Sequence, residues 1–404
     1  MATKKDASVL PQIVSSLASR DDKAETDSPP PVDDLPLSNH RHLVLHFDIN
    51  ETLLVGDEAG GDTREDSLNK ILAKSAFVKF NPAGGAISNS HTSSFEPTHW
   101  WNGDRIESTM SNKESPPPLY TGWQWPADCC PYYRTSFKSR SRNFVQHHGV
   151  IYKDLYEEMN HLLKSPITDS TDVSSDVITP GILSHMLPAF FETVVALTQS
   201  EQRFTLVFRT MGTDLPEIAA AITAFARGQH PNYPDFYNAD LILEETKLLQ
   251  GRWASNNDGQ VFQLFSRDGA MVASGDAEIL NLMHSETVCG IQDDYSFWKS
   301  NGYAPWSGKP VWIPRNNRFQ HIIMDDNIHN LPDDSIVSVR IETEDDHQHN
   351  FQTLTGPEIM RQQGRHLIRV PTVEPILNPN WFVEQIENAQ RNFAYHHSIQ
   401  QGSL

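Results

Sequence analysis

The chain has few of the features that would place it in several common protein classes. Only three of its 404 residues are cysteines, Cys129, Cys130 and Cys289. No two of them have the Cys-x-x-Cys spacing, which argues against a disulfide framework and a cysteine zinc site. No apolar run approaches the roughly 18 residues of a membrane-spanning helix, and the first residues do not lead into the apolar core of a signal peptide. We therefore expect a cytoplasmic protein that does not bind membranes.

Positive charge is also scarce. The sequence has 32 Lys and Arg against 52 Asp and Glu, a net charge of −20. Nucleic acids and anionic membrane surfaces are bound by an excess of Lys and Arg, so this balance disfavours both as partners. A small phosphate can still bind an acidic protein where a metal ion or a nearby lysine supplies positive charge. The length allows two domains, and the sequence contains no internal repeat and no signal for an oligomeric state.

One short stretch carries most of the functional information. Residues 43–47 read Leu-Val-Leu-His-Phe, an apolar run that predicts a buried strand. The run leads into Asp48, and Asn50 and Thr52 follow. A buried strand that ends in an aspartate places the carboxylate at the edge where open α/β sheets bind ligands. The same polar residues would also suit an ordinary turn, so this stretch alone leaves both interpretations open.

The rest of the chain alternates between predicted strands and helices, which is typical of an α/β fold with a mainly parallel sheet. Two more predicted strands end at polar residues, because 204–208 lead to Thr210 and 321–324 lead to Asp325 and Asp326. In a parallel sheet such strand ends lie on one edge. Further strands are predicted at 241–243, 261–265, 271–273, 311–313 and 335–341, and helices at 67–77, 151–163, 181–199, 215–225, 277–284 and 380–396. Asp214 and Glu217 are predicted to form a capping box at the start of the fourth helix.

The polar strand ends would form a site for phosphoryl chemistry. Clustered carboxylates repel one another unless a cation joins them, and an all-oxygen ligand set favours Mg²⁺. An ionised aspartate beside Mg²⁺ can attack phosphorus and form an aspartyl-phosphate. Thr210, followed by a predicted helix, would supply a hydroxyl and helix N–H groups for the transferred phosphoryl group, and Lys309 would supply a positive charge.

These residues, in this order, resemble the motifs of the haloacid dehalogenase (HAD) superfamily. The first motif of that family is Asp-x-Asp-x-Thr after an apolar strand, and it is similar to Asp48-Ile-Asn50-Glu-Thr52. The other three are a strand that ends in Ser or Thr, a lysine, and a strand that ends in an acidic pair, and they match Thr210, Lys309 and Asp325-Asp326. Lys299 and Arg315 are alternatives to Lys309.

The resemblance implies a role for each matching residue. Asp48 would be the nucleophile, and Thr210 and Lys309 would hold the phosphoryl group. Mg²⁺ would be held by the Asp48 side chain, the main-chain carbonyl of Asn50, and Asp325 or Asp326. Asp294 lies shortly before Lys309 and is predicted either to reach the substrate or to belong to an acidic surface loop.

The resemblance also implies a domain organisation. Residues 41–56 plus 181–404 would form a Rossmann-like core with a mainly parallel sheet and helices on both faces. Residues 57–180 would be a large cap inserted after the first strand, with its aromatic residues forming the cap's own core. A cap of this size favours a small phosphorylated substrate. The polar residues 1–40 are predicted to be a disordered leader.

Asn50 departs from the common pattern of the family. The phosphatases of the superfamily have an aspartate at this position, which protonates the leaving group and later activates water. An amide forms hydrogen bonds but does not carry a proton at neutral pH. Two alternatives to a phosphohydrolase therefore stay open. One is a phosphate-binding or scaffold protein that has lost turnover, and the other is a metal-independent dehalogenase, in which the aspartate attacks carbon.

Overall fold

The computed structural model describes residues 41–56, 61–79, 96–109, 118–163, 185–256, 259–330, 334–343 and 350–400. The predicted leader, 1–40, lies outside these residues. The described chain divides into two units. The small unit contains residues 65–161, and the large unit contains 41–64 and the residues from 162 onward. Among the described residues, no helix has both the length and the apolar character needed to cross a membrane.

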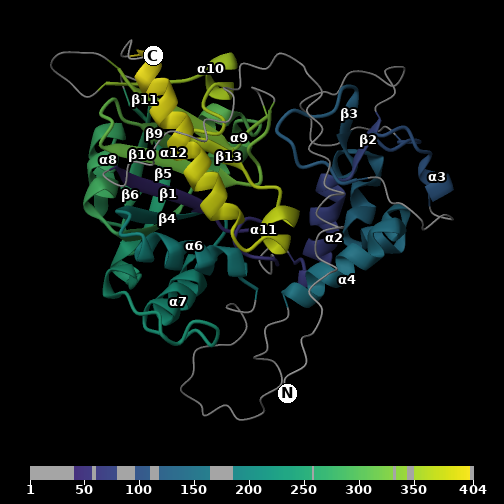
Figure 1. The fold of residues 1–404 in the computed structure, drawn as a ribbon. Helices are drawn as coiled ribbons and strands as arrows, with labels where there is room; N and C mark the ends of the chain where they lie inside the picture. The colour runs from purple at the N-terminus through teal and green to yellow at the C-terminus, as the bar shows by residue number, and fades with distance from the viewer. Residues whose placement is uncertain are drawn as a thin grey trace, which may run out of the picture. The chain divides into compact units, whose positions relative to one another are not determined.

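The large unit is built on a mixed sheet of eight strands (Figure 1). The first six in spatial order run parallel to one another, the seventh runs antiparallel to them, and the eighth is antiparallel to the seventh. The strands are, in that order, β13 (Leu367–Arg369), β10 (Phe319–Asp325), β1 (His42–Asp48), β4 (Phe204–Thr210), β8 (Val288–Gln292), β5 (Leu248–Asn256), β6 (Gly259–Phe265) and β7 (Met271–Ser274). The prediction of an α/β fold with a mainly parallel sheet is confirmed.

Successive side chains of a strand point to opposite faces of a sheet, so each face has side chains to bury. Other elements of the large unit cover both faces. On one face Phe47 packs edge-on against Phe190 of α6 (Pro188–Gln199) and Phe382 of α12 (Trp381–Gln400), with ring centroids 5.4 and 5.5 Å apart. α12 crosses the sheet in Figure 1. Two further helices, α7 (Leu215–Ala226) and α11 (Val373–Leu377), accompany α6 on this face.

The opposite face is covered by a helix and a second sheet. Val44 belongs there to a buried core that also contains Ile279 and Trp312. Ile279 lies on α8 (Asp276–Ser285), and Trp312 lies on β9 of a three-stranded sheet. The order of this sheet is β12 (Phe351–Thr353), β11 (Val337–Glu342) and β9 (Lys309–Ile313). Two short helices, α9 (Tyr295–Ser300) and α10 (Pro357–Met360), complete the large unit.

The small unit has its own core, which is rich in aromatic side chains. Trp100, Tyr132, Phe144 and Tyr152 are all buried and lie against one another. Its regular elements are α2 (Arg64–Ser75), β2 (Phe77–Lys79), α3 (Ile106–Thr109), β3 (Cys129–Pro131) and α4 (Lys153–Leu162).

Several predicted elements differ from the observed ones. Residues 241–243 are not a strand, because a 3₁₀ turn at Ala239–Leu241 precedes Leu243, whose N–H donates to the Thr223 hydroxyl on α7. Helix α6 begins at Pro188 rather than earlier, since the preceding Leu187 N–H donates to the Leu53 carbonyl at 2.8 Å.

The strands predicted at 311–313 and 335–341 are confirmed, and they pair as β9 and β11 in the second sheet. The first predicted helix ends at Ser75, and Phe77 starts a strand. The strands that were not predicted are β2, β3, β5, β8, β12 and β13.

We expect Phe47→Ala to destabilise the large unit by about 3–5 kcal/mol, because the truncation removes a fully buried ring and leaves a cavity between α6 and α12. Urea unfolding measures this loss. Val272→Ala, at a side chain that is 44% exposed on β7, is the control and should change stability by less than about 1 kcal/mol. Equal effects of the two substitutions would contradict the packing described here.

Candidate functional site

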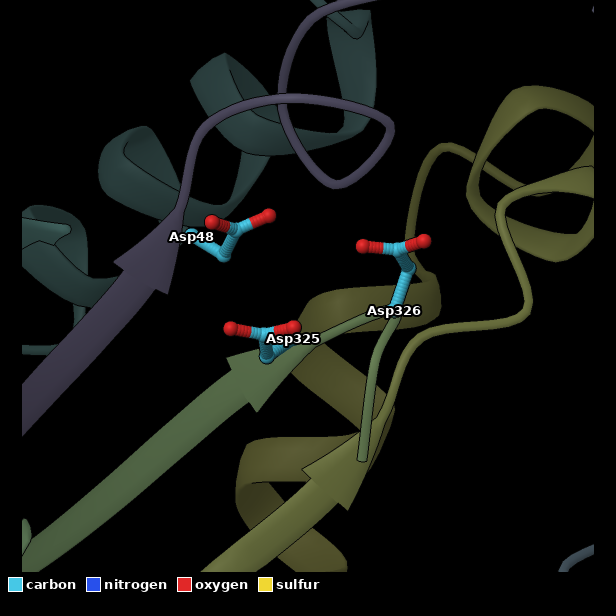
Figure 2. A group of neighbouring side chains, drawn as sticks. All are labelled: Asp48, Asp325 and Asp326. Carbon is cyan, nitrogen blue, oxygen red and sulfur yellow. The ribbon is translucent and has the colours of Figure 1, made fainter. Parts of the chain in front are cut away.

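Three neighbouring parallel strands end at the candidate site. The order β10, β1, β4 places Asp325, Asp48 and Thr210 at the same edge of the sheet, since each strand ends at one of these residues. Asp48 pairs in register with Arg209, and the Ile49 N–H donates to the Arg209 carbonyl at 3.1 Å. Figure 2 shows the carboxylates of Asp48, Asp325 and Asp326 grouped around one space beyond the ends of β1 and β10.

The three carboxylates form a buried acidic cluster. Asp48, Asp325 and Asp326 are 6%, 0% and 8% exposed, and each offers an oxygen within 4.8 Å of the others. The ammonium group of Lys309 lies among them and is almost completely buried. Its Nζ donates to Asp48 Oδ1 at 2.5 Å and to Asp325 Oδ2 at 2.7 Å. The lysine predicted from the sequence therefore contacts two of the predicted carboxylates directly.

The charges of this cluster do not balance. At the contacts of Lys309, two ionised carboxylates face one ammonium, which leaves an excess of one negative charge in a buried space. Burial and the negative charge of Asp325 raise the pKa of Asp48 well above its usual value, despite the opposing effect of Lys309. Burial alone would lower the pKa of Lys309, but Asp325 and Asp48 outweigh it, so the net shift is upward and the ammonium stays charged. The three carboxylates each offer an oxygen within 4.8 Å of the others, and this all-oxygen donor set fits a hard cation.

A tight turn after β1 joins the first and fourth predicted motifs. The Ile49 carbonyl accepts hydrogen bonds from the N–H groups of Leu53 and Leu54, both at 2.9 Å. Glu51 adopts a left-handed conformation with φ of 59°, which is unusual for a residue with a side chain. The turn directs the Thr52 hydroxyl at the backbone N–H of Asp326, from which it accepts a hydrogen bond at 3.1 Å. Thr52 is thus a structural link between the two strand ends.

Asn50 and Thr210 are joined through a third residue, Asp214. Asn50 Nδ2 donates to Asp214 Oδ2 at 2.9 Å, and the Thr210 hydroxyl donates to the same oxygen at 3.3 Å. Thr210 Oγ1 also accepts from the Gly212 N–H at 2.9 Å. The predicted capping box is wrong, because Asp214 makes no side-chain cap bond to α7 and its carboxylate turns to Asn50 instead.

Asp294 occupies a structural position in the fold. Its Oδ1 accepts from the Phe297 N–H at 3.0 Å and caps α9, and its Oδ2 accepts from the Trp253 N–H at 3.1 Å. The predicted contact with substrate stays a prediction. The neighbouring Asp293 is buried and forms an ion pair with Arg209.

A buried polar chain that the sequence analysis missed lies beneath the site. Arg209 Nη1 lies 3.3 Å from Nδ1 of His46, and a guanidinium only donates, so the His46 proton is on Nε2. His46 Nε2 therefore donates to His321 Nδ1 (3.1 Å), and His321 Nε2 donates to His284 Nε2 (3.0 Å). One arginine fixes the tautomers of three imidazoles. The sequence feature that could have indicated this polar chain is Arg209, a charged residue among the apolar residues of the strand before Thr210.

Comparison of the chain with models of protein families, with curated proteins and with solved structures found no match.

The histidine chain predicts a loss of stability in mild acid. Burial, followed by the charge of His42, lowers the pKa of His284 to about 4, so His284 is neutral in the folded protein. The unfolded chain takes up this proton below about pH 6.5, so the stability that the neutral imidazole contributes is complete above pH 6.5 and declines as the pH falls toward 4. Urea unfolding at pH 7 and pH 5 should show a smaller decline for His284→Gln than for the wild type. The control is His161→Gln, at an exposed position, which should lose as much stability as the wild type between pH 7 and pH 5. An equal loss of stability in the wild type and in His284→Gln would contradict the assignment.

Proposed function

We propose that this chain is a Mg²⁺-dependent phosphohydrolase of the HAD type that acts on a small phosphorylated substrate. The observation that carries the proposal is the ammonium of Lys309 bonded to both Asp48 and Asp325 inside a cluster of three buried carboxylates. A nucleophile, a fixed positive charge and an incompletely balanced set of oxygen ligands meet at the ends of adjacent parallel strands, where α/β sheets bind ligands.

The residues present fit a bound Mg²⁺. Asp48, the main-chain carbonyl of Asn50, and Asp325 or Asp326 would hold it. The bound ion would neutralise the cluster, keep Asp48 ionised and draw charge from the phosphoryl oxygens.

The chain's own residues would then carry out phosphoryl transfer. An Asp48 oxygen attacks phosphorus as the bond from phosphorus to the leaving oxygen breaks, which gives an aspartyl-phosphate. Water then attacks the same phosphorus, the bond to Asp48 breaks, and phosphate leaves. An ammonium has three N–H groups, and within the described chain two of those of Lys309 are engaged, so the third can donate to a phosphoryl oxygen. The Thr210 hydroxyl would donate to another once it leaves Asp214.

Asn50 determines which substrates such a site would handle well. Its Oδ1 is buried and, among the described residues, has no hydrogen-bond partner, whereas its Nδ2 is held by Asp214. An amide held in this way orients groups but does not donate a proton to a departing oxygen. The site therefore suits substrates whose leaving group departs without a proton from the position of Asn50.

The division of the chain into two units supports the domain part of the proposal. We propose that the large unit is a Rossmann-like HAD core and that the small unit, which enters the chain between β1 and α6, is its cap. A cap domain of this size would favour a small substrate.

The second candidate function is phosphate binding without turnover. Two observations favour it, since Asn50 stands where an acid–base carboxylate would be expected and the Thr210 hydroxyl is bonded to Asp214. A protein of this kind would keep the fold and the phosphate site and would act as a sensor or scaffold.

We expect Asp48→Asn to lose at least about 10²-fold in turnover of phosphate esters with Mg²⁺, because an amide is not a nucleophile toward phosphorus. A panel of phosphate esters, with phosphate release as the readout, measures this, and EDTA should abolish the wild-type activity. Turnover that survives the substitution would refute the mechanism. Phosphate release that survives EDTA would refute the role of Mg²⁺, whereas halide release from a haloacid in the presence of EDTA would favour the metal-independent dehalogenase.

Asn50→Asp separates the two candidate functions. If the wild type is an enzyme adapted to good leaving groups, the substitution should accelerate alkyl phosphates by about 10²–10⁴-fold, the usual contribution of general acid–base catalysis, and aryl phosphates by much less. The ratio of kcat/KM for an alkyl and an aryl phosphate is the measurement. Activity that appears only in the variant would support phosphate binding without turnover.

A further inference from the structure

The carbonyl groups of the two residues that flank Lys309, Gly308 and Pro310, are each held by a buried side chain from the main sheet. The indole Nε1 of Trp253 donates to the carbonyl of Gly308 at 3.3 Å, and Nη1 of Arg209 donates to the carbonyl of Pro310 at 3.0 Å. The backbone N–H of Lys309 itself donates to the Ile336 carbonyl at 2.7 Å, within the second sheet. The main chain is therefore fixed immediately before and immediately after the lysine.

Two adjacent aspartates hold the residues that make these contacts. Asp293 accepts from Nε and Nη2 of Arg209 at 3.0 and 2.5 Å, and both side chains are completely buried. Asp294 accepts from the backbone N–H of Trp253 at 3.1 Å. The pair that follows β8 thus orients both Arg209 and Trp253.

These contacts are needed because Lys309 and its carboxylates come from different sheets. Asp48 and Asp325 end strands of the main sheet, whereas Lys309 begins β9 of the second sheet, and no strand pairing joins the two sheets within the described residues. Side-chain bonds and the packing of Trp312 in the same buried core as Val44 therefore set where β9 lies relative to the main sheet. A lysine side chain has a flexible four-carbon stem, so its ammonium is well placed only if its backbone is fixed.

The chemistry of the Arg209 pair also indicates a positioning role. A buried ion pair contributes little net stability, because desolvation offsets the attraction. The planar guanidinium, however, directs its donors at fixed angles. Here one edge of Arg209 faces Asp293 while Nη1 reaches the Pro310 carbonyl. A lysine at this position could not make both contacts in this geometry.

We propose that Arg209 and Trp253, oriented by Asp293 and Asp294, are positioning residues that hold Lys309 against Asp48 and Asp325. The inference rests on the proposed function for what Lys309 does to substrate. The placement of Lys309 itself is independent of that function.

The kinetic test is a pair of double-mutant cycles with Lys309→Met. Trp253→Phe removes one hydrogen-bond donor and keeps an aromatic ring. Arg209→Lys keeps the positive charge and removes the planar set of guanidinium donors. Each should lower kcat/KM for an aryl phosphate by roughly three- to tenfold, the effect of one lost hydrogen bond. In the Lys309→Met background the same substitutions should change kcat/KM by less than about twofold.

The matched control is Trp312→Phe. It removes a second buried indole donor, which lies on β9 and donates to Asp276 of α8 at 2.8 Å rather than to a carbonyl next to Lys309. It should reduce stability about as much as Trp253→Phe and leave kcat/KM within about twofold. Equal losses in the wild-type and Lys309→Met backgrounds, or an equal loss from the control, would show a general structural effect and overturn the inference.

A second measurement needs no turnover. The exchange of the Lys309 ammonium protons with water, followed by ¹⁵N-edited NMR, should be faster in Trp253→Phe and Arg209→Lys than in the wild type and unchanged in Trp312→Phe. Unchanged exchange in the first two variants would overturn the inference. If the wild type hydrolyses no phosphate ester while the expected exchange pattern is seen, the proposed function fails and the placement of Lys309 stands.

Discussion

The bonds from the Lys309 ammonium to Asp48 and Asp325 are the interaction on which the candidate site depends. They bring one positive charge into a space that already holds three carboxylates, and all four side chains are buried. Without this ammonium, the neighbouring carboxylates of Asp48 and Asp325 would lose their shared positive charge in a buried site, which is costly. With it, the cluster still has an excess of negative charge, which suits a divalent cation together with a phosphoryl group.

The position of this ammonium explains why the protein needs its second sheet. β9 brings Lys309 to the edge where β10, β1 and β4 end, and Arg209 and Trp253 fix the chain around it. The buried carboxylate of Asp293 also contributes to this placement of Lys309, because it is paired with Arg209. The architecture thus combines a sheet that supplies carboxylates with a smaller one that supplies their counter-charge.

Local patterns in the sequence were enough to predict the strand ends. The apolar runs before Asp48, Thr210 and Asp325 predicted parallel strands, and those three strands are neighbours in the structure. Lys309 was named from a chemical requirement and a family resemblance, and it lies beside Asp48. The assignment of these residues to catalysis and metal binding remains a proposal.

Other parts of the site were not predictable in this way, because they depend on contacts between residues far apart in sequence. Arg209 and Asp293 are 84 positions apart, and no local pattern pairs them. The predicted cap at Asp214 failed because Asn50, 164 positions away, offers its carboxylate a better-placed donor. A capping box is a local signal, and here a tertiary contact overrides it.

The histidine chain below the site has a direction. Each imidazole donates its proton to the next one outward, from His46 through His321 to His284, because the innermost neighbour is a guanidinium that has no lone pair to offer. A proton that arrived at His284 could move inward only by reversing the tautomer of every ring, and it would end against Arg209. The orientation of these hydrogen bonds therefore opposes inward proton transfer along the three rings.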